Sequence, residues 1–386
     1  MDGQHEQRQV FCGIDWAERH HDVAVVDTNG TLLVKQRISD DAQGFAQLLS
    51  LLAEHGAAPG ADGTPVAIET AAGLLPAAIV AAGYRLFPIN PLAVSRYRDR
   101  YGAAKTKSDA GDAFVLANIA RTDLPAHRPL PADSELVQAV RVLARAHADA
   151  VGDRQQAQNK LCSLLREYHP AALTTLTDLS TVTARTALRL APTPQAARSL
   201  EPGQLRAALV QAGRHTHLDT EVPRIVAGLS DEQLRQLAQV EHAMGEQALA
   251  LLGLLDAASA AVTRLEKALT AAFLDHDDAP ILLSQPGLGT VLAAQLLAEL
   301  GDDRSRFASA GGLRAFASTA PITRTSGTMR GVFARRVRNR RLGAGVLPVG
   351  GCACSPPPPA PAPTTTNAGN GATGTAPPAA AWPAGT

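Results

Sequence analysis

The chain has 386 residues, 45% of them hydrophobic and 19% charged, which is the composition of a soluble globular protein long enough for two domains. No run of eighteen apolar residues occurs and residues 1–9 are polar, so we expect neither a spanning helix nor a signal peptide and predict a cytoplasmic protein without a membrane partner. The four cysteines provide neither a disulfide framework nor a four-ligand zinc site.

The charges are unevenly distributed, although 36 basic and 36 acidic residues give a formal net charge of zero. Ten arginines and no acidic residue lie between Arg304 and Arg341. A smaller basic cluster, offset only by Asp99, consists of Arg96, Arg98, Arg100, Lys105 and Lys107. Arginine-dense segments of this kind indicate phosphate binding and therefore a nucleic-acid partner. For the smaller cluster a solvated basic face is an equal alternative.

Strand and helix signals alternate over residues 10–125. The predicted strands are 10–17, 21–27, 31–38, 66–69 and 84–89, and Asn29-Gly30 is a hairpin turn signal between two of them. Ser39 and Asp40 are predicted to cap a helix that starts before Phe45, and an alanine-rich helix follows the strand 66–69. Consecutive strands followed by alternating strands and helices predict a mixed sheet with helices on its faces.

Long helices are predicted over residues 126–278. Apolar residues recur at spacings of three and four from Leu136 to Tyr168 and from Leu234 to Leu269, and Ser230 with Gln233 forms a predicted capping box before the second stretch. Sustained heptads favour a coiled coil, either within the chain or between chains. An ordinary pair of amphipathic helices packed on each other is the alternative.

Residues 279–341 form a predicted C-terminal domain, mostly helical. Its segment 284–290 contains Gly287 and Gly289 before a helix over 291–300, and such a turn presents free backbone amides to a phosphate oxygen. It resembles the second half of a helix-hairpin-helix, although two glycines before a helix are common. Residues 342–386 contain ten prolines and no charged residue, which predicts a disordered tail. Such a composition is typical of a shifted reading frame in a GC-rich gene, and a natural disordered tail is the alternative.

Four acidic residues stand where chemistry is expected. Asp15 ends the first predicted strand, Glu69 ends a later one, and Asp109 and Asp112 lie three residues apart at the start of a helix, on one helical face. If these carboxylates converge, they repel one another unless a divalent cation neutralises them. Hard oxygen ligands suit Mg²⁺ or Mn²⁺, and two such ions can assist phosphoryl transfer. Any one of these acids alone is more often a helix cap or a surface charge.

Several short motifs in the same order resemble the insertion-sequence one-hundred-and-ten transposases, DEDD recombinases related to pilin-gene invertases. The motifs are Gly13-Ile-Asp-Trp-Ala17, Ala67-Ile-Glu-Thr70, Asn90-Pro91, Lys107-Ser-Asp-Ala-Gly-Asp-Ala113, Pro286-Gly-Leu-Gly289, Leu297-Ala-Glu-Leu-Gly301, Ala320-Pro-Ile-Thr-Arg-Thr-Ser-Gly327 and Asn339-Arg-Arg341. The resemblance covers about residues 10–342. It departs from the family after Arg341, where the family continues into amphipathic helices.

The resemblance implies an α/β RNase H/RuvC-like DEDD nuclease domain over 10–125 and a transposase domain over 279–341. Asp15, Glu69, Asp109 and Asp112 would bind Mg²⁺ or Mn²⁺. Ser326 would attack the scissile phosphate and hold a DNA end as a phosphoserine. Without the resemblance, Ser326 is a turn serine before Gly327.

The partners that the resemblance implies are DNA, a structured guide RNA in some members, and other copies of the chain in a dimer or tetramer. The predicted nucleic-acid-binding residues are Arg96, Lys105, Lys107, Gly287, Gly289, Arg324, Arg330, Arg335, Arg336 and Arg338. Arg324 and Arg330 would also stabilise charge on the phosphate in the transition state.

Four other functions remain open at this stage. A RuvC-type junction nuclease would lack the long helices and the arginine-rich serine segment. An actin-like ATPase or sugar kinase would need a second glycine-rich phosphate loop near residues 150–200, where none occurs. A coiled-coil DNA-binding scaffold leaves the four acids unexplained. A catalytically dead DNA-binding remnant would follow if the altered C-terminus abolishes activity.

Overall fold

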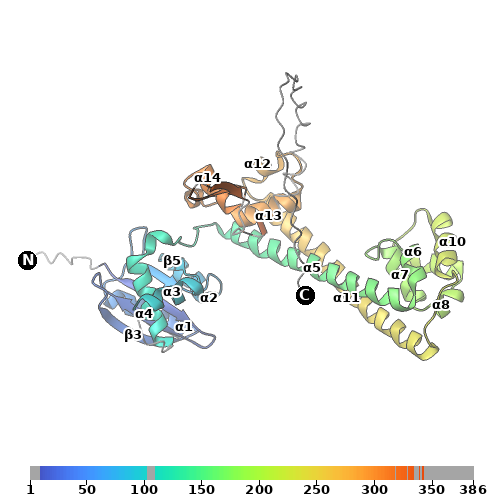
Figure 1. Cartoon of the computed structure of the whole chain (residues 1–386), viewed down its shortest axis with the longest axis horizontal. Coiled ribbons are helices and arrows are strands. Elements are labelled where there is room, and N and C mark those ends of the chain that lie inside the picture. The colour runs from blue at the N-terminus through green and yellow to red at the C-terminus, as the bar shows by residue number, and fades with distance from the viewer. Residues whose placement is uncertain are drawn as a thin grey trace, which may run out of the picture. The chain divides into compact units, whose positions relative to one another are not determined.

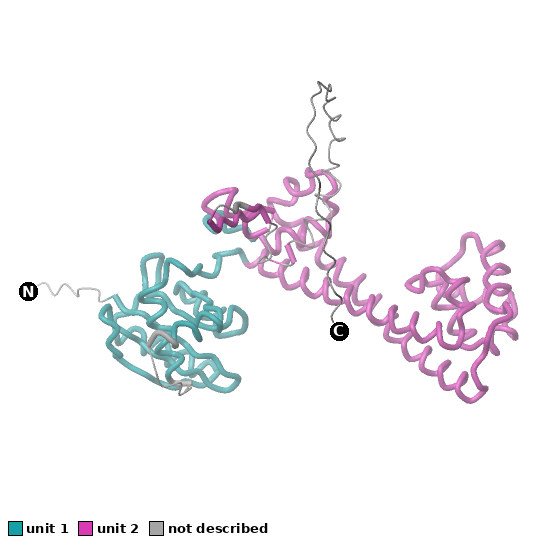
Figure 2. The backbone as a smooth tube through the Cα atoms, in the orientation of Figure 1, with its two compact units in different colours: residues 1–134, 301–306 teal, residues 135–300, 307–386 magenta. Residues whose placement is uncertain are grey.

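The computed structural model describes residues 9–101, 109–317, 319–327, 329–333, 339 and 341–342. It contains two compact units (Figures 1 and 2). The first consists of residues 1–134 and 301–306, and the second of residues 135–300 and 307–386. Apart from Leu342, the tail that the sequence predicts to be disordered lies outside the described residues.

The first unit contains a mixed sheet, as its alternating strand and helix signals predict. The strands are β1 (Phe11–Trp16), β2 (His20–Val26), β3 (Leu32–Ser39), β4 (Pro65–Ile68) and β5 (Arg85–Pro88), in the order β3-β2-β1-β4-β5. Strands β1, β2 and β3 are antiparallel neighbours, whereas β4 is parallel to β1 and β5 is parallel to β4. The predicted Asn29-Gly30 turn connects β2 to β3, with Gly30 at φ +85° and the Asp27 carboxylate accepting the amides of Asn29 and Thr31.

Helices cover both faces of this sheet (Figure 1). Helices α1 (Ala42–Glu54) and α2 (Leu74–Ala81) pack on the face that Cys12 and Ile14 line. Helices α3 (Pro91–Tyr101) and α4 (Asp109–Thr122), the latter followed by the 3-10 turn η1 (Leu124–Ala126), lie on the face that Phe11 and Ala67 line. The predicted cap of the first helix is wrong by one to two residues. Asp41, not Ser39 or Asp40, caps α1, because Asp40 instead pairs with His21 and Ser39 donates a hydrogen bond to Asp41.

Helix α4 lies directly against β1 because residue 13 has no side chain. A Cβ atom at Gly13 would lie 2.1 Å from the carbonyl oxygen of Ala113 and 2.3 Å from the backbone nitrogen of Ala117. Both are backbone atoms, which cannot move aside as the end of a side chain can. The glycine therefore sets the distance between the sheet and α4.

Residues 301–306, which include the 3-10 turn η2 (Arg304–Arg306), join the first unit through three aspartates. The Asp133 carboxylate accepts the amides of Asp302 and Asp303 at 3.1 and 3.3 Å. In return, Asp302 accepts the amide of Ser134 at 2.9 Å and Asp303 accepts that of Ala132 at 3.1 Å. We call this exchange of backbone amides the aspartate clasp. It connects segments about 170 positions apart in the sequence.

The second unit is built on two long helices, α5 (Glu135–Tyr168) and α11 (Ala238–Leu274), which pack against each other within the chain. Leu161 and Leu165 of α5 share a core with Leu252 and Leu255 of α11. Between α5 and α11 the chain forms a small helical bundle, which consists of α6 (Pro170–Thr175), α7 (Val182–Leu190), α8 (Pro194–Arg198), α9 (Pro202–Gln211) and α10 (Leu218–Leu229). A helix pair packed within the chain was the alternative that the sequence left open beside a coiled coil within the chain or between chains.

The predicted capping box at Ser230 and Gln233 is wrong, and so is the predicted start of the second heptad stretch. Ser230 ends α10, and the Gln233 side chain accepts the amide of Ala171 instead of capping a helix. Helix α11 begins only at Ala238, so Leu234 and Leu237 are 93% and 78% exposed in the preceding loop. Tertiary hydrogen bonds that sequence spacing cannot show therefore hold this loop out of the helix.

The C-terminal part of the second unit contains α12 (Ala279–Leu283), α13 (Thr290–Leu300) and α14 (Ala310–Phe316), followed by a hairpin of β6 (Ile322–Ser326) and β7 (Met329–Phe333). The helices agree with the mostly helical prediction for this region. The hairpin was not predicted from the sequence. Its alternation of Ile322, Arg324 and Ser326 with two threonines, followed by Gly327 at φ +58°, is the local signal that could have indicated it.

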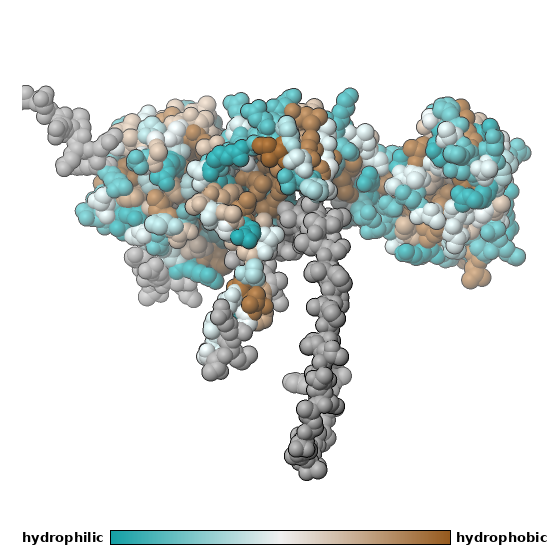
Figure 3. Space-filling model, turned by 90° about the horizontal axis from the view of Figure 1, so that it is seen from above, coloured by the Kyte–Doolittle hydropathy of each residue, from teal (hydrophilic) through white to brown (hydrophobic). Residues whose placement is uncertain are grey.

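Helix α11 is long and apolar enough to cross a membrane by length and composition, although only 28% of its most apolar window is buried. Its charged side chains pair with neighbouring segments of the same unit. Asp256 binds Arg185 and Arg189, and Glu241 binds Arg235. Figure 3 shows one face of the whole molecule, on which hydrophilic and hydrophobic residues are interspersed. These ion pairs lie within the second unit.

Gly13→Ala is expected to destabilise the first unit by about 3 kcal/mol, because the added methyl group collides with the backbone of α4. Urea unfolding followed by circular dichroism measures this change. The control is Gly152→Ala in the middle of α5, where a Cβ meets nothing within 4 Å. That substitution should be neutral or stabilise the helix by about 0.5–1 kcal/mol. Equal effects of the two substitutions would contradict the packing argument.

Acid is expected to weaken the second unit through Glu241, which is 2% exposed. Hydrogen bonds from Arg235 hold the pKa of the Glu241 carboxyl below its ordinary value. The stabilisation is therefore complete above the unfolded pKa of about 4.3 and is lost as the pH falls through the lower folded pKa. Urea unfolding between pH 6 and pH 3 tests this. Glu241→Gln should be less stable at pH 6 and should show a shallower pH dependence than the unaltered chain.

Candidate active site

Asp15 and Glu69 lie side by side at one edge of the sheet. The parallel register of β1 and β4 pairs Gly13 with Ala67 and Ile14 with Ile68, so the next residues along the two strands are Asp15 and Glu69. Both residues are half-buried. Side chains alternate along a strand, and therefore Asp15 projects from the same face as Gly13, the face that α4 covers.

The direction of α4 brings its first turn to this same end of β1. Near the end of the helix, the Arg121 guanidinium donates a hydrogen bond to the Thr28 carbonyl in the β2–β3 turn. This turn follows Val26, which is paired with Phe11 at the start of β1. The middle of α4, at Ala113 and Ala117, contacts Gly13. The start of the helix, with Asp112, therefore lies toward the end of β1 where Asp15 is. The structure thus brings Asp15, Glu69 and Asp112 to one region of the first unit.

The fourth predicted acid, Asp109, begins α4, but its side chain lies outside the described residues. Asp112 is 7% exposed and forms an ion pair with Arg98 of α3. Within the described part of the chain, no three His, Cys, Asp or Glu side chains are close enough together to hold one metal ion as they stand. The donor chemistry nevertheless suits a hard divalent cation, because Asp15 and Glu69 follow paired strand positions and Asp112 lies in the first turn of α4.

A further carboxylate beside Asp15 was missed in the sequence. The antiparallel register pairs Asp15 of β1 with Asp22 of β2, and it pairs Asp22 with Arg37 of β3. Arg37 donates two hydrogen bonds to Asp22, Nε to Oδ1 at 3.0 Å and Nη2 to Oδ2 at 2.8 Å. These bonds hold the pKa of the Asp22 carboxyl below its usual range. The tight turn after Trp16 was the signal, since it fixes which residue of β2 faces Asp15.

Ser326 belongs to the second unit, whereas the four acids belong to the first. It is the last residue of β6, is exposed, and directly precedes Gly327 in the hairpin turn. Arg324, also exposed, lies on the same strand two residues earlier, with its guanidinium carbon 5.8 Å from the centre of the Phe333 ring. The hydroxyl and this guanidinium therefore project from one side of an exposed hairpin.

The structure places only some of the predicted basic residues. Arg96 is exposed on α3, and Arg330 belongs to β7, but the side chain of Arg330 lies outside the described residues. The predicted residues that lie wholly outside the described residues are Lys105, Lys107, Arg335, Arg336 and Arg338. The prediction that the arginine-rich segment binds nucleic acid therefore rests on its amino-acid composition and not on a described arrangement of its side chains.

The two predicted phosphate-loop glycines lie in an exposed turn between α12 and α13. Gly287 has φ +82°, a conformation that favours glycine, and a Cβ at Gly289 would meet nothing within 4 Å. The Gly289 carbonyl accepts the amide of Ala293 in the first turn of α13. The two glycines thus lie in a turn between two helices, and phosphate binding by this turn stays a prediction.

Asn339 of the Asn-Arg-Arg motif has a structural role. Its Oδ1 accepts the amides of Arg341 and Leu342 at 3.0 and 3.1 Å, as a helix N-cap does. Its Nδ2 donates to the buried Glu299 carboxylate at 2.7 Å, and the other Glu299 oxygen accepts two hydrogen bonds from Arg145. This network links the end of the motif to α13 and α5.

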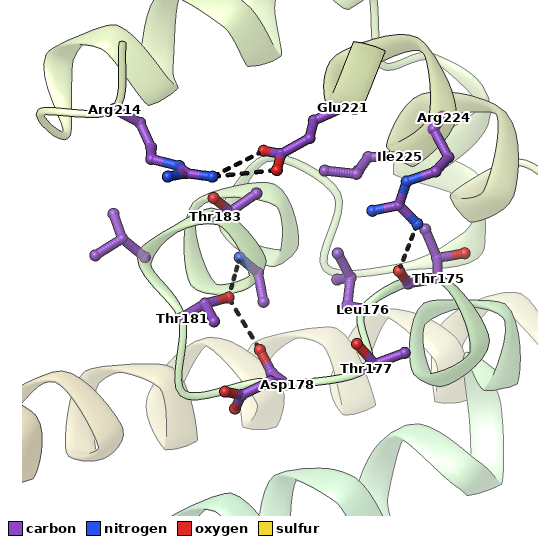
Figure 4. Close-up of a pocket in the computed structure, with 12 residues that line it drawn as sticks. Thr175, Leu176, Thr177, Asp178, Thr181, Thr183, Arg214, Glu221, Arg224 and Ile225 are labelled. Carbon is purple, nitrogen blue, oxygen red and sulfur yellow. Dashed lines mark hydrogen bonds and ion pairs between the residues drawn. The ribbon is translucent and has the colours of Figure 1, made fainter. Parts of the chain in front are cut away.

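A polar pocket of about 430 Å³ lies in the helical bundle, away from the predicted site residues of the second unit (Figure 4). Its charged groups bind partners within the bundle. The Arg214 guanidinium pairs with Glu221, and the Arg224 guanidinium donates to the Thr175 carbonyl. The Asp178 carboxylate accepts the Ser180 amide. The pocket therefore offers little unmatched charge to a ligand.

Two protein families match separate parts of the chain, one near each end. A family described as a DEDD transposase of the IS110 type matches residues 12–170, and one described as the transposase IS116/IS110/IS902 family matches residues 279–342. A protein described as the mini-circle transposase for IS117 of Streptomyces coelicolor is 56% identical over 86% of this chain and 81% of the relative. The chain belongs to the IS110 family of transposases.

Two more distant relatives by sequence are also proteins of insertion elements. A protein of insertion element IS900 from Mycobacterium paratuberculosis is 32% identical over 86% of this chain and 82% of the relative. A protein of IS110 from Streptomyces coelicolor is 30% identical over 86% and 81%. The Thermus thermophilus RuvC structure aligns with 32% of this chain and all of its own at 19% identity, with a TM-score of 0.24.

The chain is thus a transposase, an enzyme that recombines DNA, as the motifs predict. Its first unit has the mixed α/β architecture predicted for the RuvC-like domain. Membership of a DEDD family, together with the three carboxylates at the end of β1, points to a divalent metal. A DNA-acting enzyme of this family is expected in the cytoplasm.

Asn339→Ala is expected to destabilise the second unit by about 2 kcal/mol, because it removes a helix cap and the hydrogen bond that Asn339 donates to the buried Glu299 carboxylate. Urea unfolding followed by circular dichroism measures the loss. Asn339→Ser is the matched variant, since serine keeps the cap but cannot reach Glu299. It should lose about half as much stability. If the alanine variant unfolds at the same urea concentration as the unaltered chain, the described network does not stabilise this unit.

Proposed function

We propose that this transposase cuts and rejoins DNA through two chemical elements, an acidic site that binds divalent cations and a serine nucleophile. Asp15, Glu69, Asp109 and Asp112 would hold Mg²⁺ or Mn²⁺. Ser326 would attack the scissile phosphate. The single observation that best supports the proposal is the register of β1 and β4, which sets Asp15 beside Glu69 at the end of the sheet where α4 begins.

The carboxylates would act by binding and orientation. Two adjacent half-buried acids repel each other, so the pair favours a cation that relieves the repulsion. When bound, the cation supplies Lewis-acid polarisation of the phosphate oxygens. The role of Asp15, Glu69 and Asp112 is to fix its position on a rigid strand edge and helix end. Asp22 accepts hydrogen bonds from two nitrogens of Arg37 and would remain outside the ligand set.

In each step of the serine reaction, one phosphorus–oxygen bond would form as another breaks. The Ser326 hydroxyl loses its proton as its oxygen forms a bond to phosphorus, while the bond from phosphorus to a deoxyribose oxygen breaks and that oxygen takes up a proton. The reverse reaction with the deoxyribose hydroxyl of a second strand releases the serine and joins the strands. Arg324 projects from the same strand as Ser326 and could bind the phosphate oxygens as their charge increases.

The long helices and the tail complete the proposal. The helices α5 and α11 would support a dimer or tetramer, in addition to their packing within the chain. A guide RNA is a prediction from the family resemblance.

We further propose that residues 342–386 replace the family's own C-terminal helices. Sequencing the DNA around codon 342 in all three reading frames tests this proposal.

Asp15→Asn and Glu69→Gln are expected to abolish Mg²⁺-dependent strand exchange and to leave DNA or RNA affinity nearly unchanged, because the carboxylates bind metal and not phosphate. Exchange is measured on labelled DNA, and affinity is measured at several salt concentrations, where the slope should not change. Asp62→Asn, on an exposed loop of the same unit, is the matched control. Full exchange activity in the Asp15 variant would contradict the metal-site proposal. Binding without Mg²⁺-dependent exchange in the unaltered chain would instead favour a scaffold that only binds DNA.

Ser326→Ala is expected to abolish strand exchange and also any covalent protein–DNA adduct, which denaturing electrophoresis detects. Ser305→Ala is the control serine in the same basic stretch. Both variants are made in the present chain and in a version that carries the family's C-terminus. Loss of the adduct with retained DNA cleavage would favour a RuvC-type nuclease, and normal recombination without the hydroxyl would contradict the nucleophile. Binding without cleavage by either parent chain would indicate a dead remnant.

A further inference from the structure

The side chain that contacts Asp112 is a cation of the protein itself. Arg98 projects from α3, and its Nη2 donates a hydrogen bond to Oδ1 of Asp112 on α4. The Asp112 side chain is 10% exposed and that of Arg98 is 33% exposed, so the pair is largely removed from water. Because an isolated carboxylate is costly to bury, the guanidinium compensates the charge of Asp112.

The bonding of Arg98 is incomplete. Its Nε is buried and has no hydrogen-bond partner among the described residues, and one nitrogen of the guanidinium binds one oxygen of Asp112. A buried N–H group without an acceptor is unfavourable. The pair therefore stabilises the site less than a guanidinium–carboxylate pair with two parallel bonds would.

The pair on the other side of Asp15 provides the comparison. Arg37 binds both oxygens of Asp22 through two nitrogens, at 3.0 and 2.8 Å. Asp22 is paired with Asp15 across β1 and β2, and Asp112 belongs to α4, the helix that covers the same face of the sheet. In the Arg37 pair both carboxylate oxygens of Asp22 accept a hydrogen bond from the guanidinium. In the Arg98 pair the guanidinium donates to one oxygen of Asp112, and its buried Nε has no partner among the described residues. Arg98 is consequently the guanidinium that can be displaced more easily.

We propose that Arg98 is a positioning residue that occupies Asp112 when the acidic site holds no metal and is displaced from it when a divalent cation binds. The inference rests on the proposed metal site. The cation and the guanidinium compete for Oδ1 of Asp112, because both bind the same lone pairs and their positive charges repel each other. Arg98 thereby keeps the acidic site folded without metal and lowers its affinity for metal.

Mn²⁺ binding to the full chain, followed by isothermal titration calorimetry and by the electron paramagnetic resonance signal of free Mn²⁺, tests the competition. Arg98→Gln should bind Mn²⁺ roughly tenfold more tightly, the effect of removing one charge-assisted hydrogen bond. Arg98→Lys should be intermediate, because lysine keeps the charge without the planar guanidinium. Arg96→Gln, the same change of charge on an exposed position of the same helix, should alter the affinity less than about twofold if the effect requires contact with Asp112.

Thermal unfolding of the same proteins supplies a second measurement. Without metal, Arg98→Gln should unfold at a lower temperature than the unaltered chain, and saturating Mn²⁺ should raise its unfolding temperature by more than that of the unaltered chain. An arginine that only joins α3 to α4 would give the lower unfolding temperature with no change in Mn²⁺ affinity. That result, or weaker Mn²⁺ binding in both Arg98 variants, overturns the inference.

Asp15→Asn separates this inference from the metal-site proposal. If Asp15→Asn leaves Mn²⁺ affinity unchanged, the metal does not bind at these acids and both proposals fail. If Asp15→Asn greatly weakens Mn²⁺ binding while Arg98→Gln and Arg98→Lys bind as the unaltered chain does, the metal site stands and only the role of Arg98 is wrong. Should Arg98→Gln fail to fold, the comparison of Arg98→Lys with Arg96→Gln decides the outcome.

Discussion

The close approach of α4 to β1 is the constraint on which the acidic site depends. Gly13 lets the backbone of α4 touch the strand, and two residues later the same strand face carries Asp15. A larger residue at position 13 would move the whole helix and with it Asp112. The geometry of the acids is therefore set by an absent side chain between two backbones. Catalytic groups on such rigid elements keep their spacing better than groups on loops do.

The sequence predicted the elements of the first unit well because its signals there are local. The Asn29-Gly30 turn, the short apolar strand before Glu69 and the apolar spacing after Phe45 each act over a few residues. Asp22 escaped the prediction because its position depends on pairing between strands. Arg98 appeared in the sequence only as one of several basic residues, and its pairing with Asp112 requires the contact between two helices.

The errors in the second unit have the same origin. The heptad spacing continues through Leu234 and Leu237, so periodicity alone extends the helix by several residues too many. The loop is held instead by contacts with distant residues, such as the bond from the Ala171 amide to Gln233. Similarly, the role of Asn339 as cap and as donor to Glu299 cannot be read from the motif that contains it. Motif matching identified the family, and the fold shows which contacts one motif residue makes.

The aspartate clasp makes the first unit discontinuous in sequence. Since Ala132 and Ser134 donate to Asp303 and Asp302, a gene fragment that ends after residue 134 omits the acceptors of two backbone amides and leaves the Asp133 carboxylate without the two amides that it accepts. Expression of residues 1–134 alone therefore yields a first unit that lacks the clasp. Conversely, a break in the chain between residues 135 and 300 leaves two polypeptides that each carry half of the clasp. Residues 1–134 therefore complete these hydrogen bonds only when residues 301–306 are also present.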